Sequence, residues 1–595
     1  MNRPRSLQEF VHWLEVGAGA RWIVRAALLA GVLVLSLWIS YTQFHGPVHE
    51  TTLVQADTGR QLARGAGFTT QVNFPQTVAV LQARGVRFDP AQAYPELHHA
   101  PLYPLVIAAG LRVLPEGRRE ALFGPTASPL DGFRADYFLL GLNLVLLWLA
   151  AWLTYDLGRR LFEPRVGWVA LFALLFSVPV WQQTVAVDGT PLLMVLALAA
   201  FGCWARVEAA SEGRGRWLWL GALGLLCGLL FLTEYTAGAL VLVALGYAVA
   251  RFAGRERGLA LTVIAVGFVL VTAPWVIRNL SLTGSPTALA VQNVALKAGD
   301  STAEPVNVRA TLSADLMAID LRKLGNKTLT ALQDNLKSRI WSGGAMWLAA
   351  FFVAGWLYAF RSEAANRLRW VAASALGVLL LAQAALNSGE SPRLVTTWLS
   401  PVLMIFGAGF FFVLLGSNAR LSQWPRAMAA LLLVIQALPL LHSLFEPKRL
   451  HFHYPPYFPT LFHGMREELD RRVERGRFGI MADVPAGVAW YGDVRTWAQP
   501  PKLRDFYAVS LEQPIGELLL TPRTLDRPFF SELNARPVQP GSLSAVANRF
   551  GEWGEIYAGL LTGRMPGEFP LGSPQKFAEN FYVLLNPALP PPKGR

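Results

Sequence analysis

The sequence predicts a multi-pass α-helical membrane protein of about eleven spans, followed by a small α/β domain. Three observations carry this prediction: the composition, a series of long apolar runs, and arginines that gather in alternate connections between the runs. Of the 595 residues, 53% are hydrophobic and only 16% are charged, and the mean hydropathy is +0.35. Such a composition is too apolar for an ordinary soluble protein. Both cysteines, Cys203 and Cys227, lie in apolar runs, so neither a disulfide framework nor a thiolate metal site is expected.

Eleven apolar runs are candidates for spans, and those of about 15 residues are the shortest that could serve. They are residues 23–41, 138–157, 166–183, 189–205, 217–233, 236–250, 258–275, 341–360, 370–386, 394–416 and 427–445. The N-terminal stretch MNRPRSLQEFVHWLEVGAGARWIVR is basic and amphipathic and leads into the first run. We therefore expect that run to remain as a membrane anchor rather than to be cleaved as a signal.

Arginines set the expected orientation of these spans. With a cytoplasmic N-terminus, the cytoplasmic connections carry Arg159, Arg160, Arg165, Arg206, Arg214, Arg216, Arg251, Arg255, Arg257, Arg361, Arg367, Arg369, Arg420 and Arg426. The short connections on the other side hold only Arg393. This bias predicts a cytoplasmic N-terminus and an extracytoplasmic C-terminal domain. It also accounts for the formal net charge of +13 without a nucleic acid as a partner.

The stretch ELHHAPLYPLVIAAGLRVLP, residues 96–115, contains an apolar run that is too short to span. Residues 101–114 would rise about 21 Å as a helix, whereas the hydrocarbon layer is roughly 30 Å thick. The alternation of the arginines also requires that this run does not cross the membrane. We therefore expect it to lie along the outer membrane surface.

Three large segments then lie outside the membrane: the loops 42–137 and 276–340, and residues 446–595. Residues 1–445 are expected to form the transmembrane domain and residues 446–595 a separate α/β domain. The latter has a helical run, PTLFHGMREELDRRVERGR, and then short apolar runs, FGIMADV, GVAWYGD, ELLLTP and NFYVLLNP. The Pro-rich tail NPALPPPKGR is expected to be disordered.

Five motifs in order resemble those of the GT-C superfamily of polyprenyl-phosphate-sugar-dependent glycosyltransferases, in particular bacterial relatives of protein O-mannosyltransferases and aminoarabinose transferases. They are ARGAGF (63–68) after an acidic residue, HHAPLYPL (98–105), APWVIRNLSLTGSP (273–286), SPRLVTTWLSP (391–401) and DVPAGVAWYGDVRTWAQP (483–500). The resemblance covers nearly the whole chain. The Asp-Glu pair that is usual in the family stands here as His49 and Glu50, and the doubled proline as Ala100 and Pro101.

The resemblance implies a substitution at a sugar's anomeric carbon, in which a carboxylate takes the acceptor's proton. Glu50 lies close to where the family places its acidic residue and is the first candidate for this base. Asp57 is the second candidate, and a solvated loop carboxylate is the alternative for both. Asp188, in VAVDGTP, is expected on the same side, where it could orient the acceptor or, as we favour, cap the next helix.

The departing polyprenyl phosphate requires cations. Arg278 and Arg393 are the candidates because both stand at outer ends of spans, where a guanidinium can grip phosphate oxygens. The alternative for each is an arginine that reaches to lipid headgroups. Asn279 is a candidate cavity residue, although it could simply hold the turn, and Glu234 is expected to repel a phosphate rather than bind it.

The resemblance also implies that the short run near residue 100 walls a cavity where the lipid donor and the acceptor meet. His98, His99 and Tyr103 could offer hydrogen bonds there, at the level of the lipid headgroups. The alternative is ordinary interfacial anchoring.

Together these features predict an enzyme of the bacterial inner membrane that moves one sugar from a polyprenyl phosphate to an extracytoplasmic lipid, glycan or protein. The donor is the expected small-molecule partner, and the sequence leaves the sugar, the acceptor and any metal requirement open. One alternative is a non-catalytic descendant of the fold that serves in envelope assembly. Another is a transporter or flippase, which would need polar residues near the midplane, where these spans hold almost no charges.

Overall fold

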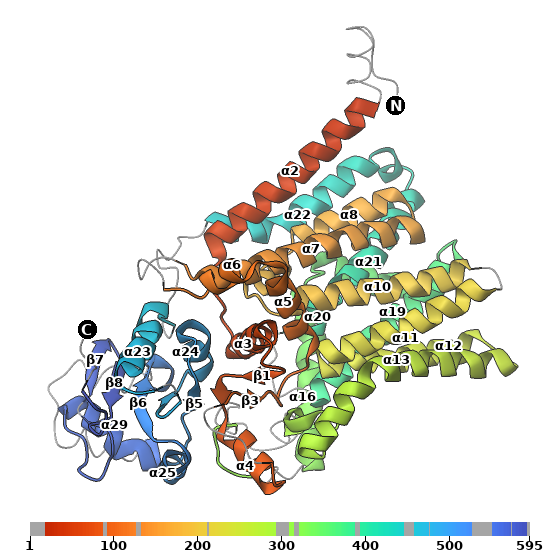
Figure 1. The fold of residues 1–595 in the computed structure, drawn as a ribbon. Helices are drawn as coiled ribbons and strands as arrows, with labels where there is room; N and C mark the ends of the chain where they lie inside the picture. Colours follow the sequence, from red (N-terminus) through yellow and green to blue (C-terminus); the bar gives the residue numbers. More distant parts are fainter. Residues whose placement is uncertain are drawn as a thin grey trace.

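A computed structural model describes residues 18–86, 92–125, 132–210, 213–292, 309–314, 320–386, 393–445, 457–474, 476–525, 550–572 and 574–591. It consists of a large helical body and a smaller α/β region that lies beside one end of it (Figure 1). The C-terminus belongs to the α/β region, and the N-terminal helix projects from the far side of the helical body. The predicted fold class, a multi-pass helical protein with a small α/β region, is confirmed.

In the part of the chain that the structure describes, eight helices are long and apolar enough to cross a membrane. They are α2 (Ala18–Gln43), α7 (Arg134–Leu161), α10 (Thr190–Ala209), α11 (Arg214–Thr233), α13 (Gly254–Thr283), α19 (Glu363–Leu386), α21 (Ser400–Ser417) and α22 (Pro425–Phe445). Two bent pairs raise the number to ten within the described residues: α8 (Pro164–Leu175) with α9 (Val178–Val185), and Leu321–Ser342 with Trp347–Leu357. The eleventh expected span, 236–250, lies in Tyr235–Arg251, which is among the shorter apolar helices.

Two of the expected spans fall in bent helix pairs rather than in straight helices. The first pair bends by 55° where a proline stands in the first turn of α9, and the second bends by 115°. In the second pair, Gly343 and Gly344 pack directly against the backbone carbonyls of Thr396 and Thr397, so the chain turns where no side chain intervenes. Hydropathy registers the apolar run but not the break within it.

Glycines allow the close packing of α11 against α13. A Cβ atom on Gly267 of α13 would lie 2.7 Å from the carbonyl oxygen of Gly221 on α11. Helices in a membrane associate largely through such close backbone approaches, because lipid supplies no hydrophobic force between them. This pair forms one edge of the helical body (Figure 1).

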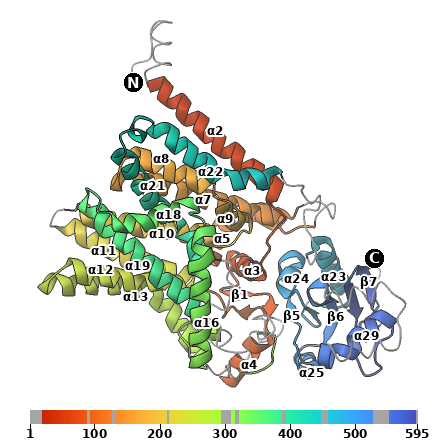
Figure 2. The same cartoon turned by 180° about the vertical axis from the view of Figure 1, so that it is seen from behind.

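The short apolar run near residue 100 folds as α5 (Leu102–Val113), a helix of 12 residues. At 1.5 Å per residue it rises only about 18 Å, as the sequence predicted for an element that does not span. It packs against α3 (Glu50–Arg64), where a Cβ on Gly59 would meet Ile107 at 2.7 Å. In the view from behind, α3 lies between the helical body and the α/β region (Figure 2).

The α/β region is built on a six-stranded sheet of order β2-β5-β4-β6-β8-β7. The strands are β2 (Val72–Asn73), β4 (Gly479–Ala482), β5 (Thr496–Ala498), β6 (Ile515–Leu520), β7 (Gln575–Ala578) and β8 (Phe581–Leu585). Its first four strands are parallel, and β8 and β7 are antiparallel to their neighbours. The helices include α23 (Pro459–Arg472), α24 (Pro485–Gly492), α25 (Leu503–Glu512) and α29 (Gly554–Thr562).

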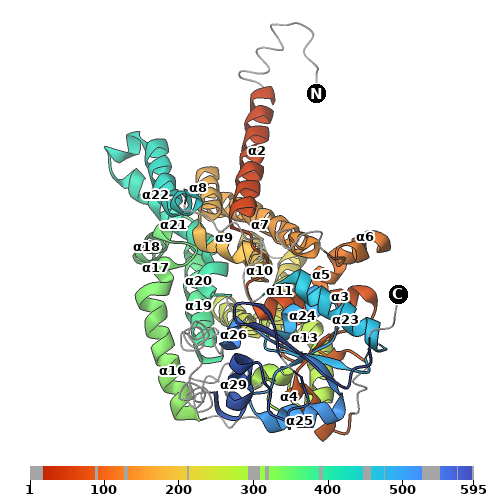
Figure 3. The ribbon, with the colours of Figure 1, turned by 90° about the vertical axis from the view of Figure 1, so that its left-hand side faces the viewer.

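Two details of this region differ from the sequence-based picture. Strand β2 comes from the first outer loop, so the sheet joins residues of both predicted domains. The run GVAWYGD forms the helix α24, which is buried on every side and packs against α3 (Figure 3). A fully buried segment shows no periodicity that could distinguish a helix from a strand. Of the Pro-rich tail, residues 592–595 lie outside the described residues.

Candidate active site

Arg393 lies at the meeting point of three segments that are far apart in the sequence. Its side chain is only 5% exposed, and it stands just before α20 (Val395–Trp398). Its guanidinium donates to the side-chain oxygen of Gln55 on α3, and it forms an ion pair with Glu234 at 3.2 Å. The cation also lies over the ring of Tyr103, with 5.8 Å between Cζ and the ring centroid.

A buried charge needs such partners because burial otherwise favours the neutral state. Arg393 could have been an arginine that reaches to lipid headgroups, but its guanidinium is instead held inside the protein by Gln55 and Glu234. Glu234, which we expected to repel a phosphate, is the carboxylate that balances this cation. No signal in the sequence pairs residues that are 159 and 338 positions apart.

Asp188 stands in the turn between α9 and α10. The next residue, Gly189, packs against Arg393 and Tyr103. A Cβ on Gly189 would lie 3.3 Å from both Arg393 Cζ and the ring of Tyr103. Asp188 is fully buried, and its Oδ1 accepts a hydrogen bond from the backbone amide of Thr190 at 2.8 Å. The N-cap residue of α10 is Gly189, so Asp188 is not the helix-capping residue that we favoured from the sequence; it stands one position earlier and accepts from the first amide of the helix. Its Oδ2 has no hydrogen-bond partner among the described residues.

The backbone of this turn is strained and firmly held. Val187 has φ of 52°, a left-handed conformation that is unfavourable for a β-branched residue. The hydroxyl of Tyr103 donates to the carbonyl of Val187 at 2.6 Å, and the side-chain amide of Asn143 donates to the carbonyl of Asp188 at 2.8 Å. Backbone strain that the surroundings enforce in this way is typical of functional sites.

Burial raises the pKa of Asp188 above its ordinary value, and the nearby Arg393 acts in the opposite direction. His49, which precedes α3, also lies within electrostatic reach of Asp188 and Arg393. Burial lowers the pKa of His49, while Asp188 opposes that change. The site therefore combines a cation, a buried carboxyl group with one free oxygen, and an imidazole that is neutral near pH 7.

Glu50 and Asp57, the two sequence-based candidates for the base, are engaged elsewhere. Glu50 forms an ion pair with Arg523, and its other oxygen accepts from the backbone amide of Ala486 at 3.3 Å. Both partners belong to the α/β region, so Glu50 links α3 to that region.

Asp57 is fully buried on α3, and both of its oxygens are occupied. Oδ1 accepts from Arg60 at 2.6 Å, and Oδ2 accepts from the hydroxyl of Thr70 and the amide of Gln71 at 2.9 and 2.6 Å. These contacts hold the segment after α3 against the helix.

Arg278 belongs to a second cluster. It lies against the rings of Trp275 and Phe68, with 4.4 and 5.3 Å from Cζ to the centroids, and donates to the carbonyls of Phe68 and Glu96. Asn279 accepts from Arg278 and donates to the carbonyl of Pro286 at 3.1 Å, so it holds the turn after α13. Arg278 and Arg393 therefore have different partners.

His98 and His99 are organised by Glu96, which the sequence did not single out. Glu96 Oε1 accepts from the backbone amides of both histidines and pairs with His99 Nδ1 at 2.9 Å. Burial would raise the pKa of Glu96, but the interactions with His99 and His98 lower it to about 2. His98 also pairs with Thr77 at 3.2 Å. Among the described residues, no group of three or more His, Cys, Asp or Glu side chains is arranged to hold a metal ion.

The comparisons agree with the resemblance seen in the sequence. Residues 138–277 match the family described as dolichyl-phosphate-mannose-protein mannosyltransferase. The structure of ArnT from Cupriavidus metallidurans bound to undecaprenyl phosphate has a TM-score of 0.52 and 14% identity, covering 95% of this chain and 98% of that one. AglB from Archaeoglobus fulgidus, in complex with an inhibitory peptide and a dolichol-phosphate, has a TM-score of 0.47 and 13% identity, covering 84% and 70%. No curated protein sequence matches the chain.

The fold is similar to that of ArnT over almost the full length of both chains. The arrangement around Arg393 and Asp188 can bind an anion and hold a carboxyl group beside it. These are the two functions that a phosphate leaving group and a hydroxyl acceptor require.

Proposed function

We propose that this protein transfers one sugar from a polyprenyl phosphate to an extracytoplasmic acceptor, a lipid, glycan or protein. The observation that supports this most is the buried pair Arg393 and Asp188, with the half-buried His49 within electrostatic reach of both, in a fold like that of ArnT. A polyprenyl phosphate is the kind of lipid bound in the ArnT structure. The proposal places the protein in the bacterial inner membrane with this cluster on the outer side, as the arginine bias favours.

Arg393 is proposed to bind the phosphate of the donor. Its guanidinium already lies beside Glu234 and Gln55, so a phosphate would compete with these partners for its N–H groups. A planar guanidinium can donate two parallel hydrogen bonds to a phosphate, whereas an ammonium cannot. Arg278 remains a second candidate, with its guanidinium already stacked between two aromatic rings.

Asp188 is proposed as the base that accepts the proton of the acceptor hydroxyl, ahead of Glu50. A raised pKa brings a carboxylate closer to the range in which proton transfer is efficient. Asp188 has a raised pKa and one oxygen free of hydrogen bonds, whereas both oxygens of Glu50 have partners in the α/β region. Asp57 is given a structural role because both of its oxygens are occupied.

Phosphate binding is tested with Arg393→Ala and Arg393→Lys in the purified full chain, with undecaprenyl phosphate as the probe. Loss of a charged hydrogen bond costs about 1.5 to 3 kcal/mol, so Arg393→Ala should weaken binding by about ten- to a hundredfold. Arg393→Lys should recover only part of it. Arg426→Gln, an exposed arginine elsewhere, is the control and should bind as the parent does. Equal binding by parent and Arg393→Ala would reject the assignment.

The base is tested by sugar transfer in membranes from a polyprenyl-phosphate donor. Asp188→Asn keeps a side-chain oxygen that can accept from the Thr190 amide but loses the proton affinity, so turnover should fall by about 10² to 10⁴ while donor binding survives. Glu50→Gln should retain most of its turnover if the protein is intact. Full turnover by Asp188→Asn with a dead but folded Glu50→Gln would return the role to Glu50. Absence of transfer by the parent with every donor would favour the non-catalytic alternative.

A further inference from the structure

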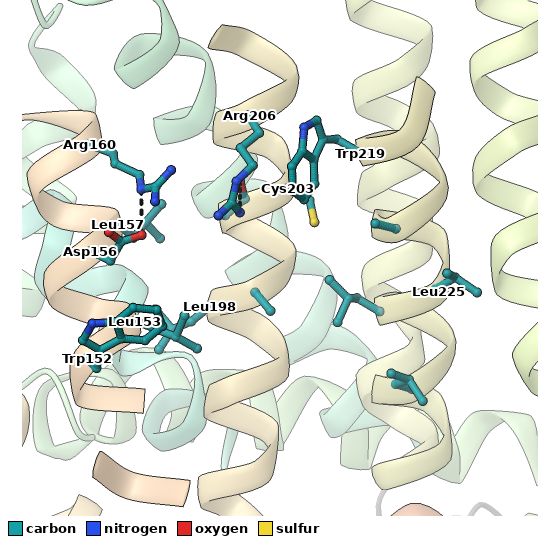
Figure 4. Close-up of a pocket in the computed structure, with 15 residues that line it drawn as sticks. Trp152, Leu153, Asp156, Leu157, Arg160, Leu198, Cys203, Arg206, Trp219 and Leu225 are labelled. Atoms are coloured by element: carbon teal, nitrogen blue, oxygen red, sulfur yellow. Dashed lines mark hydrogen bonds and ion pairs between the residues drawn. The ribbon is translucent and has the colours of Figure 1, made fainter. Parts of the chain in front are cut away.

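A cavity of about 480 Å³ is lined by residues of α7, α10 and α11 (Figure 4). On α10 its lining runs from Leu198 to Arg206, in the C-terminal part of the helix, whereas Asp188 precedes the start of that helix. Its volume falls within the range of about 300 to 1,000 Å³ that is common for small-molecule pockets. Leucines supply much of its wall: Leu153, Leu157, Leu198, Leu225, Leu226 and Leu229. An apolar chain therefore fits its interior, and a polar molecule does not.

Charged groups gather at one end of this cavity. Arg160 and Arg206 lie there with Asp156, and the leucines extend away from them (Figure 4). Asp156 accepts from Arg160 at 2.6 Å and from Arg159 at 2.7 Å. Two guanidinium groups thus pair with this one carboxylate, and Arg206 lines the cavity as a further cation, which leaves an excess of positive charge at this end.

Arg206 is the cation with the fewest protein partners in this cluster. Its guanidinium lies over the ring of Trp219 at 4.4 Å and makes one long hydrogen bond, 3.4 Å, to the carbonyl of Gly202. Within the described part of the chain it forms no ion pair. A guanidinium has five N–H donors, so most of those of Arg206 remain available to an anion.

The length of the cavity matches one leaflet of a bilayer. Trp219 and Leu229 lie ten residues apart on α11, which corresponds to about 15 Å of helix. This is half of the roughly 30 Å hydrocarbon thickness. The edge of the cavity reaches the outer surface of the helical body at Trp152, which is 58% exposed, so a lipid can enter from the side.

We infer that this cavity binds an anionic phospholipid, with its phosphate at Arg206 and Arg160 and an acyl chain along the leucines. Basic pockets between spans at headgroup level are suited to such lipids. The sequence predicts that these arginines lie on the cytoplasmic side, opposite the proposed transfer site. The lipid would therefore be a bound component of the membrane, distinct from the sugar donor, and the inference does not rest on the proposed transfer.

The test measures lipid binding to the purified full chain in detergent by native mass spectrometry. The probes are phosphatidylglycerol and phosphatidylcholine with identical acyl chains. We expect phosphatidylglycerol to bind about ten- to a hundredfold more tightly, because its phosphate is not balanced by a headgroup cation. Arg206→Gln should abolish this preference, and Arg426→Gln, an exposed arginine outside the cavity, should keep it.

Two further variants test the acyl-chain slot. Ala199→Phe and Ala222→Phe each add a ring to the wall from a half-buried position on α10 or α11, and each should weaken the binding of both lipids. Size-exclusion profiles check that the variants are intact. Equal binding of the two lipids, or equal behaviour of Arg206→Gln and Arg426→Gln, would overturn the inference. The inference would also be overturned if the purified chain retained polyprenyl phosphate instead of phospholipid. The same holds if the chain were a dimer that Ala199→Phe or Ala222→Phe dissociates, because a second copy would then occupy the cavity.

Discussion

Asp57 and Arg60 form an ion pair in which both side chains are nearly inaccessible. Arg60 also donates to the carbonyls of Ala489 and Trp490 in α24, at 2.8 and 3.0 Å. The pair therefore joins α3 to the α/β region in addition to holding the outer loop. Without Asp57, the buried Arg60 would keep only its longer ion pair with Asp493, at 3.4 Å, and the loss of a buried partner costs far more than the loss of an exposed pair.

Asp57→Asn should therefore act on stability rather than on chemistry. We expect a loss of roughly 3 to 5 kcal/mol, seen as a lower detergent-extracted yield and a lower Tm. Glu120→Gln breaks the ion pair of a partly exposed carboxylate with Arg64 and is the control, with an expected effect below about 1 kcal/mol. A stable Asp57→Asn variant that binds donor but transfers no sugar would contradict this structural role.

The sequence predicted several residues of the candidate site but none of their pairings. Arg393 and Asp188 could be selected because each was expected at the outer end of a span, where few polar residues occur. Gln55, Asn143 and Glu96 gave no such signal. Their roles depend on contacts between segments that only the folded chain brings together.

At the scale of elements, length and periodicity were reliable guides. The shortness of α5 and the helix α23 followed directly from residue counts and periodicity. The two-residue strand β2 was not predictable, because a segment that short has no hydrophobic pattern. It is a strand only through its parallel pairing with β5. The break between α8 and α9 escaped detection for the opposite reason, because the apolar run is continuous while the helix is not.

Strand β6 carries a carboxyl group, Glu517, in the middle of the sheet. It is only 1% exposed, and its Oε2 has no hydrogen-bond partner among the described residues. Burial, with Glu468 nearby, raises the pKa of Glu517 to about 8. Because the folded state then holds a proton that the unfolded state releases, its stabilising contribution is complete below about pH 4.5. It is lost as the pH rises toward 8.

Glu517→Gln should consequently raise the Tm of the full chain at pH 8, where the parent pays the cost of ionisation, and have little effect at pH 5. The gain is on the order of 2 to 4 kcal/mol at pH 8. Glu579→Gln, an exposed carboxylate between β7 and β8, is the control and should show no such dependence on pH. A Tm difference for Glu517→Gln that is the same at both pH values would show that the carboxyl group does not titrate in this way.

At the scale of the whole molecule, the α/β region is held against the helical body by direct contacts between the two. Trp490 and Tyr491 of α24 donate to the carboxylate of Asp136 at 2.8 and 3.0 Å, at the start of α7. Together with β2 and the ion pair of Glu50 and Arg523, these contacts fix α24 beside α3. The first outer loop therefore connects the membrane spans, the proposed transfer site and the sheet.

The proposed activity is tested most directly by the polyprenyl-phosphate-linked sugars of a strain that lacks this protein. If the protein consumes such a donor, one lipid-linked sugar should accumulate in the deletion strain. Its level should return to normal with the parent protein and with Arg426→Gln, but not with Arg393→Ala or Asp188→Asn at equal abundance. A lipid-linked sugar profile that is the same with and without the protein would contradict the proposal.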